Sequence, residues 1–277
     1  MRTSVGSGIH TLNLSFPDGR PMFSKAITCE PAPSFAQGLT TAGLGAPDYD
    51  LARQQHHAYC AALEKCGLEL LRMDSDADFP DATFVEDTAI LTSHCAVIAN
   101  PGAPSRRGEV NRMRSVLAGF FPALLAIEPP GTVDGGDICE AGRHFFVGLS
   151  ERTNDAGAEQ LAALLAPFGY TFEFVDIRGN DGLLHLKSGL SYLGDNRLAI
   201  VPALLEAADF ASYELIKVEA HEAYAANCVR VNDHVIVAAG YPAFAARLQE
   251  LGYQTIVLEM SEFRKMDGGL SCLSLRF

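Results

Sequence analysis

The last eleven residues of the chain, 267–277, combine residue types that could form a catalytic site. Asp267 precedes two glycines, and Cys272 follows in an apolar, strand-like tail. Glycine lets the backbone turn sharply or approach a ligand closely. We expect a strand that begins just after the glycines, with Cys272 on one face and Leu273 and Leu275 on the other. A thiol placed in this way could act as a nucleophile, although a buried core cysteine fits the same pattern.

A second group of residues is acidic and lies in segment 79–87. Asp81, Glu86 and Asp87 surround an apolar stretch, so any of them that points inward needs a partner. A guanidinium, with five donors in one plane, is a natural match for convergent carboxylates. Solvated loop carboxylates or a cation site would explain the same residues, but their spacing does not match an EF-hand loop.

Two arginines could bind a group of the opposite charge. Arg106 precedes a predicted helix, and Arg152 lies between a predicted strand and the next helix. Either side chain could bind a carboxylate, and either could belong to a solvated turn. Together with the acidic segment they offer both signs of charge, which is the profile of a site for a zwitterionic amino acid.

His185 and Asp134 could complete a catalytic group with Cys272. His185 lies between two leucines at the start of a predicted strand, and Asp134 precedes two glycines. A lone histidine in an apolar strand is usually a core residue with its hydrogen bonds satisfied. A cysteine, a histidine and a carboxylate nevertheless form a recognised set of nucleophile, base and orienting group.

A recurring strand–turn–strand pattern must position these residues. The predicted pairs are 82–91 with 95–99, 136–140 with 144–149, 189–193 with 198–201, and 228–231 with 235–238. Helices are predicted at 49–66, 109–120, 154–168, 203–208 and 242–251. A unit repeated about every 40–50 residues is typical of a propeller or closed array. The strand at 25–29 joined to the C-terminal tail would supply a fifth unit and place Cys272 at the centre. An ordinary α/β sandwich is the alternative.

Length and composition indicate one globular domain. The 277 residues are 48% apolar and 20% charged, and no linker divides residues 22–277. Residues 1–21, rich in glycine and proline, are interpreted as a flexible leader without a function of its own. Residue Met22 could then be the start of the folded unit.

Charge and cysteine usage restrict the partners. A net charge of −13 argues against nucleic acid and fits a cationic small molecule. There is no apolar run long enough to span a bilayer and no secretory signal, so we expect no membrane partner. Seven cysteines without compact spacing indicate a reducing cytoplasm rather than a disulfide framework. A homodimer is compatible with the sequence, which does not fix the oligomeric state.

Several motifs together resemble the bacterial dimethylarginine dimethylaminohydrolases, which belong to the same superfamily of guanidino-modifying enzymes as the arginine deiminases. The resemblance extends from about residue 22 to the end of the chain. The motifs are Gly38-Leu-Thr40, Leu44-Gly-Ala-Pro-Asp-Tyr49, Phe79-Pro-Asp81, Phe84-Val-Glu-Asp87, Ser105-Arg-Arg-Gly-Glu109, Gly131-Thr-Val-Asp-Gly-Gly-Asp137, Arg152-Thr-Asn154, His185-Leu-Lys187, Tyr224-Ala-Ala-Asn-Cys228 and the tail 267–277.

This resemblance implies a five-module, pseudo-symmetric α/β propeller (pentein), in agreement with the repeat count. It implies a hydrolase that converts asymmetric dimethylarginine or monomethylarginine to L-citrulline and an amine. The catalytic residues would be Cys272, which forms a covalent thiouronium intermediate, His185 as general acid and base, and Asp134 where bacterial relatives often carry a glutamate. The implied substrate-binding residues are Leu39, Asp81, Glu86, Asp87, Arg106, Arg152 and Asp267. No cofactor and no metal are implied.

Lys187 bears on substrate choice. In arginine deiminases the residue two positions after the histidine is typically an aspartate that grips the guanidinium. A lysine cannot grip a cation, so we expect weaker binding of plain arginine and room for N-methyl groups. The glycine-rich segment 38–45 is the predicted lid over the site.

The sequence is also compatible with other functions. The chain could be a deiminase-like hydrolase of another guanidino compound, or a binding homologue without turnover. A papain-like protease would have its cysteine ahead of its histidine, which is the reverse of the order here. A zinc protein lacks support, because no fixed multi-ligand spacing is present.

Overall fold

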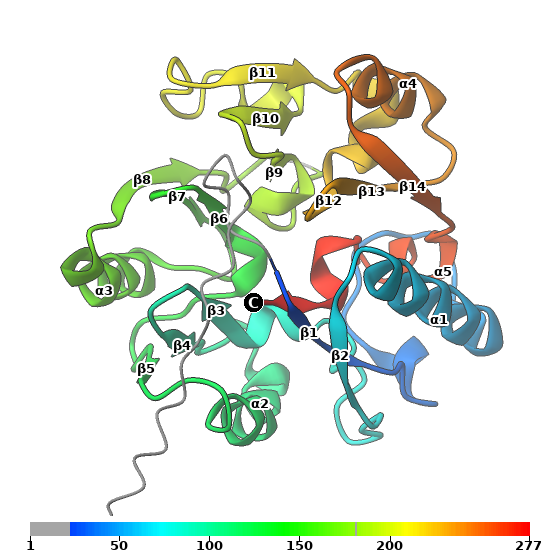
Figure 1. Ribbon diagram of the computed structural model, residues 1–277. Helices are drawn as coiled ribbons and strands as arrows, with labels where there is room; N and C mark the ends of the chain where they lie inside the picture. Colours follow the sequence, from blue (N-terminus) through cyan, green and yellow to red (C-terminus); the bar gives the residue numbers. More distant parts are fainter. Residues whose placement is uncertain (1–22, 181) are drawn as a thin grey trace, which may run out of the picture.

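The computed structural model describes residues 23–180 and 182–277, and it consists of five three-stranded sheets. Figure 1 shows the sheets arranged around a centre, with the C-terminal segment beside β1. The predicted leader, residues 1–21, and Met22 lie outside the described residues. The strands, sheet by sheet, are β15 (Leu275–Arg276), β1 (Lys25–Cys29) and β2 (Glu69–Met73); β3 (Ala89–Leu91), β4 (Ala96–Ile98) and β5 (Leu124–Ala126); β6 (Ile138–Ala141), β7 (His144–Leu149) and β8 (Thr171–Asp176); β9 (Leu190–Tyr192), β10 (Arg197–Ile200) and β11 (Glu214–Lys217); β12 (Val229–Val231), β13 (His234–Ala238) and β14 (Gln254–Leu258).

Every sheet follows one pairing rule. The middle strand pairs antiparallel with one neighbour and parallel with the other. Parallel strands need a crossover, and helices supply it in four modules. These helices are α1 (Tyr49–Lys65), α2 (Glu109–Leu117), α3 (Asp155–Leu165) and α4 (Pro242–Glu250), and the short α5 (Ser261–Arg264) follows β14. The five-module architecture predicted from the repeat is confirmed.

The closing module is built from both ends of the described chain, as predicted. Strand β1 pairs with β15 through Ala26 opposite Arg276 and Ile27 opposite Leu275. Asn232 secures this closure, because its side chain accepts a hydrogen bond from Phe23 N (2.9 Å) and donates to Phe23 O (3.0 Å) and Cys66 O (2.9 Å). The chain therefore closes into a ring.

The helix at 49–66 illustrates how the sequence determines local structure. Asp48 caps α1, accepting a hydrogen bond from Leu51 N at 2.9 Å, and Gly67 ends the segment with φ +92°. Tyr59 and Leu63 lie on the buried face of α1.

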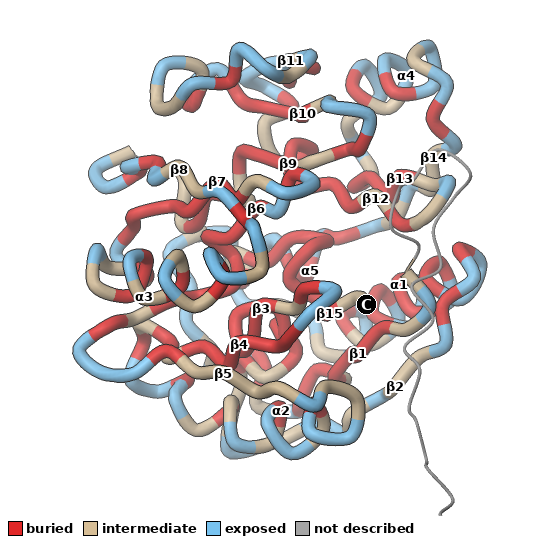
Figure 2. The backbone as a smooth tube through the Cα atoms, turned by 60° about the vertical axis from the view of Figure 1, so that its left-hand side comes forward, coloured by how far each residue is buried: buried red, intermediate tan, exposed pale blue. Residues whose placement is uncertain are grey.

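Figure 2 shows that the buried backbone gathers in the interior of the molecule, while exposed residues lie on the outer loops and helices. Among the described residues, no helix combines the length and apolarity needed to cross a membrane.

Three predicted elements were wrong in type or extent. Segment 82–91 is a strand only at Ala89–Leu91, because Val85–Thr88 is a 3₁₀ turn. In the tail, Ser271–Leu273 is also a 3₁₀ turn, and the strand starts only at Leu275, so the proposed alternation from Cys272 does not hold. Backbone groups near these turns bond to side chains instead of a strand partner, as Ser271 N does to Asn227 Oδ1 at 2.9 Å. The helix at 203–208 is reduced to the turn Pro202–Leu204, since so short a segment cannot repay helix nucleation.

Candidate active site

All predicted site residues except Glu86 line one cavity at the centre of the ring. Segments that precede or follow strands of different modules bring them together. The lining residues are Leu39, Asp81, Phe84, Asp87, Arg106, Asp134, Arg152, Leu184, His185, Met266, Asp267, Gly268 and Cys272.

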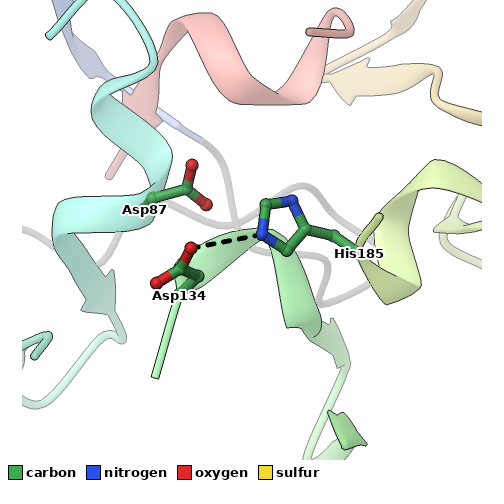
Figure 3. A group of neighbouring side chains, drawn as sticks. All are labelled: Asp87, Asp134 and His185. Atoms are coloured by element: carbon green, nitrogen blue, oxygen red, sulfur yellow. Dashed lines mark hydrogen bonds and ion pairs between the residues drawn. The ribbon is translucent and has the colours of Figure 1, made fainter. Parts of the chain in front are cut away.

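His185 faces two carboxylates that come from other elements (Figure 3). Its Nε2 atom lies 3.3 Å from Asp134 Oδ2, and Asp134 Oδ1 accepts a hydrogen bond from Gly102 N at 2.9 Å. Asp87 is held by Gly136 N, 2.8 Å from its Oδ1. Burial lowers the pKa of His185, but the negative charges of Asp87, Asp137 and Asp134 outweigh it and raise the pKa to about 9. The imidazole is therefore protonated in the free protein at neutral pH.

Asp137 supports the segment around His185 and was not assigned a role from the sequence. Its carboxylate accepts hydrogen bonds from Ser150 Oγ and Thr153 Oγ1, both at 2.7 Å, and from Leu186 N at 3.0 Å. Burial raises the pKa of Asp137 to about 6, against the opposing effect of His185 and these donors. The aspartate fixes the backbone of the residue that follows His185. Its place in the motif at 131–137 was the only signal for it in the sequence.

Cys272 lies in the 3₁₀ turn Ser271–Leu273, and its side chain is buried. Its Sγ atom lies 3.5 Å from Gly269 N, which points toward it as a donor. Burial, with the charges of Glu86 and Asp87, raises the pKa of the thiol to about 12, while Gly269 N–H and Lys187 act in the opposite direction. In the free protein the cysteine is thus a thiol.

Glu86 faces Lys187 and Ser271 rather than the cavity. Lys187 Nζ lies 2.6 Å from Glu86 Oε1, and Ser271 Oγ donates to Glu86 Oε2 at 2.7 Å. Arg276 Nη2 approaches the same carboxylate at 3.8 Å. The glutamate charge is therefore balanced by a lysine within the protein.

The two predicted arginines differ in what they bind. Arg106 is buried between two carboxylates: Nη1 donates to Asp87 at 2.5 Å, and Nη2 donates to Glu109 at 2.8 Å. Nη2 also donates to Phe84 O at 3.0 Å. The partner Glu109 was quoted in a motif but not predicted as a site residue, and burial raises its pKa to about 7 despite Arg106. Arg152 lines the cavity and forms no side-chain ion pair or hydrogen bond with any described residue.

The predicted lid is held down by two site aspartates. Leu39 N donates to both carboxylate oxygens of Asp81 (3.1 and 3.2 Å). Thr41 donates from N (2.5 Å) and Oγ1 (3.0 Å) to Asp267 Oδ2. Asp267 has φ +56°, a left-handed conformation that aspartate tolerates better than most residues. Both aspartates therefore connect the cavity to the segment predicted as its lid.

One group of side chains could also hold a divalent ion. Asp87, Asp134 and His185 offer ligand atoms within 4.8 Å of one another, and no other such group occurs in the described ranges. An ion bound there by all three residues would require an unprotonated ring nitrogen on His185, because a nitrogen that carries a proton cannot be a ligand. Protonation of that nitrogen and binding of an ion through it therefore exclude each other.

Comparisons with known proteins show the family of the chain. The sequence model of the arginine deiminase family matches residues 76–224. An N(G),N(G)-dimethylarginine dimethylaminohydrolase of Pseudomonas aeruginosa is 44% identical over 92% of this chain and 100% of its own length. The solved structure of a cysteine-to-serine mutant of the P. aeruginosa enzyme with citrulline has a TM-score of 0.89, with 43% identity over 92% of this chain and 100% of that one.

Two further structures extend these findings. A histidine-to-glycine mutant of a dimethylarginine dimethylaminohydrolase, as an adduct with S-methyl-L-thiocitrulline, has a TM-score of 0.89 and 43% identity over 92% of this chain and 100% of that one. The N-terminal domain of ArgZ, at 19% identity over 91% of this chain and 97% of that one, has a TM-score of 0.81 and shows the fold alone. The fold and the comparisons define a guanidino-modifying enzyme of the pentein type. Within that class, the chain belongs to the dimethylarginine dimethylaminohydrolase family.

Proposed function

We propose that this protein hydrolyses Nω-methylated L-arginine to L-citrulline and dimethylamine or methylamine, with Cys272 as nucleophile. The observation that carries the proposal is the buried cavity in which a thiol, a protonated histidine and several carboxylates meet. Family membership at 44% identity supports the reaction class. A guanidinium is a cation. Asp81 has no ion-pair partner among the described residues, and Asp87 shares Arg106 with Glu109, so these carboxylates retain negative charge for the substrate.

The protonation states determine the order of steps. Both Cys272 and His185 carry a proton in the free protein. Binding of the cationic substrate beside the thiol lowers the pKa of Cys272 and releases its proton to solvent. The thiolate then attacks the guanidinium carbon, and His185 donates its proton to the departing amine, which is too basic to leave as an anion.

In the second half of the reaction, the same histidine acts as a general base. After the amine has left, neutral His185 removes a proton from water, and the resulting hydroxide attacks the thiouronium carbon. The carbon–sulfur bond breaks, citrulline is formed and Cys272 leaves as the thiolate. Asp134 orients the ring and stabilises its charged form.

Lys187 favours methylated substrates in this proposal. Because it pairs with Glu86 at 2.6 Å, the carboxylate is already neutralised and offers little extra attraction to an unsubstituted guanidinium. An aspartate at position 187 would give plain arginine one more counter-charge, and Lys187 does not. Without that contact, the guanidinium nitrogens of the substrate can carry methyl groups.

Citrulline release from asymmetric dimethylarginine, monomethylarginine and arginine tests the function directly. We expect turnover of the two methylated substrates and at least about tenfold lower kcat/KM for arginine, the equivalent of roughly 1.4 kcal/mol. A preference for plain arginine would identify a deiminase and remove the argument from Lys187. Absence of citrulline from all three would refute the proposed substrate class.

Arg152 is proposed to bind the substrate carboxylate, since its guanidinium has no partner among the described residues. We expect Arg152→Gln to raise KM about 10–100-fold with little change in kcat, because a charge-assisted hydrogen bond contributes about 1.5–3 kcal/mol. The matched control is Arg178→Gln, an exposed arginine paired with Asp155 and Asp176. Equal KM values for Arg152→Gln and the wild type would exclude this role.

We further propose a single catalytic domain over residues 22–277 and a location in the cytoplasm. Closure of the ring through β1 and β15 supports one domain. All seven cysteines are free, which fits a reducing compartment. Sedimentation velocity would distinguish a monomer from the homodimer that the sequence allows.

A further inference from the structure

Asn227 is not among the residues that line the cavity. It follows the 3₁₀ helix Ala220–Ala226 and precedes β12, where the fourth module gives way to the fifth. The residue is buried, with 7% of its surface exposed. The motif at 224–228 contains it, but nothing in the proposed mechanism uses that motif.

The side-chain amide of Asn227 joins the two segments that carry the reacting groups. Its Nδ2 donates to Lys187 O at 2.9 Å, in the turn Leu186–Ser188 that follows His185. The same nitrogen donates to Ser271 Oγ at 3.1 Å, and Oδ1 accepts from Ser271 N at 2.9 Å. Ser271 directly precedes Cys272. One side chain thus connects the backbone beside the acid to the backbone beside the nucleophile.

These contacts require an amide of this length. The group facing the Lys187 carbonyl must donate, and the atom facing Ser271 N–H must accept, so aspartate cannot satisfy both. The approach is also close: a Cβ atom on Gly269 would lie 2.5 Å from Asn227 Cγ and Oδ1. Gly269 therefore allows the turn of the nucleophile to pack against the amide.

We propose that Asn227 is a positioning residue that sets the separation of Cys272 and His185, given the proposed reaction. The two groups belong to segments more than eighty residues apart, and each is held to the amide by its own backbone. The substrate-binding side chains Asp81 and Arg152 belong to other segments. Loss of the amide should therefore impair the chemical steps and leave substrate binding largely intact.

The test compares Asn227→Ala with Asn232→Ala. Asn232 is a matched control, because its amide also accepts one bond from a backbone N–H, donates two bonds and joins distant segments, but it does so at the ring closure. Asn232 has φ +52°, a conformation in which alanine is strained. Asn232→Ala should therefore lose at least as much stability as Asn227→Ala. For Asn227→Ala we expect kcat to fall about 100-fold and KM to stay within about threefold of the wild type.

Two outcomes would overturn the proposal: kcat of Asn227→Ala within about threefold of wild type, or an equal loss of kcat in Asn232→Ala. If Asn227→Ala does not fold, Asn227→Asp replaces it, because it keeps the size and the acceptor but removes the donor to Lys187 O. We expect at least about a tenfold loss of kcat for it. Thermal unfolding of every variant confirms that folded protein is compared.

Crystal structures of the two alanine variants provide a reading that does not depend on turnover. We expect the turn Ser271–Leu273 to shift relative to His185 in Asn227→Ala and to keep its place in Asn232→Ala. An unmoved turn in Asn227→Ala would overturn the positioning role even if the substrate were another guanidino compound. Wild-type inactivity on methylarginine, in contrast, would overturn the proposed function and leave this structural comparison standing.

Discussion

Cys272→Ser is expected to reduce citrulline formation by about 10⁴-fold or more while the protein stays folded and still binds substrate. A serine hydroxyl is far less acidic than a thiol, and loss of a nucleophile typically removes most of an enzyme's rate enhancement. The measurement is single-turnover citrulline release, with substrate binding followed by calorimetry. Serine differs from cysteine by one atom, so a cavity change cannot explain a loss of this size.

The control is Cys95→Ser, another buried cysteine. A hydroxyl there has a partner, since Thr92 Oγ1 lies 3.7 Å from Cys95 Sγ, and the residue lies between β3 and β4. We expect nearly wild-type turnover from this variant. Activity of Cys272→Ser within about tenfold of the wild type would remove Cys272 from the mechanism.

The pH dependence of alkylation tests the ionisation assigned to Cys272. Its pKa near 12 in the free protein means that the thiolate fraction grows about tenfold per pH unit from pH 7 to 10. Alkylation of the Cys272 peptide by iodoacetamide, followed by mass spectrometry, should rise with that slope. A plateau below pH 8 would show that the thiol is already ionised before substrate binds.

His185→Ala is the second large effect, an expected loss of about 10²–10⁴-fold in kcat on asymmetric dimethylarginine. The loss depends on the leaving group. S-methyl-L-thiocitrulline releases a thiolate, which needs no proton, so the first step should proceed in the variant. Hydrolysis still requires a base, and the covalent adduct should accumulate and appear in the intact mass of the protein.

The pH profile gives a second reading of His185. Its pKa is raised to about 9, so the acid form is present below that pH and lost as the pH rises through it. Wild-type kcat/KM for dimethylarginine, which reports ionisations of the free enzyme, should decline above about pH 9, and the decline should be absent in His185→Ala. His57→Ala, an exposed histidine on α1, is the control and should keep the wild-type profile. If His185→Ala turned over dimethylarginine normally and formed no adduct with S-methyl-L-thiocitrulline, His185 would be excluded as the general acid.

The sequence predicts periodic features of this fold better than its turns. Repeated strand pairs showed five modules, and helix caps such as Asp48 marked the helix ends. The turns at Val85–Thr88 and Ser271–Leu273 were missed because side chains, not a strand ladder, satisfy nearby backbone groups. The third strand of each module was also missed, since strands such as β2 and β14 are half-exposed and carry a mixed pattern.

Residue types indicated the chemistry of the site, but distant contacts decide its arrangement. A cysteine and a histidine are recognisable by type, whereas Asn227 contacts Lys187 and Ser271, which lie far from it in the sequence and which no local pattern reveals. Side-chain length alone could not show whether Asp134 reaches His185, because the reach also depends on where the backbone of Asp134 lies. A hydrogen bond from Asp134 N to Thr153 Oγ1, at 3.1 Å, holds that backbone in place. Likewise, only the structure shows that Glu86 pairs with Lys187.

The closure of the ring has a consequence for how the protein folds. Ala26 and Arg276 are paired across nearly the whole described chain, while the other four sheets form from contacts within short stretches of sequence. Bringing such distant residues together costs more chain entropy than closing a local hairpin. We therefore expect strands β15 and β1 to meet late, after the local modules have formed. Because Cys272 lies three residues before β15, we expect its turn to become ordered only in that final step, so that an incompletely folded chain has no assembled site.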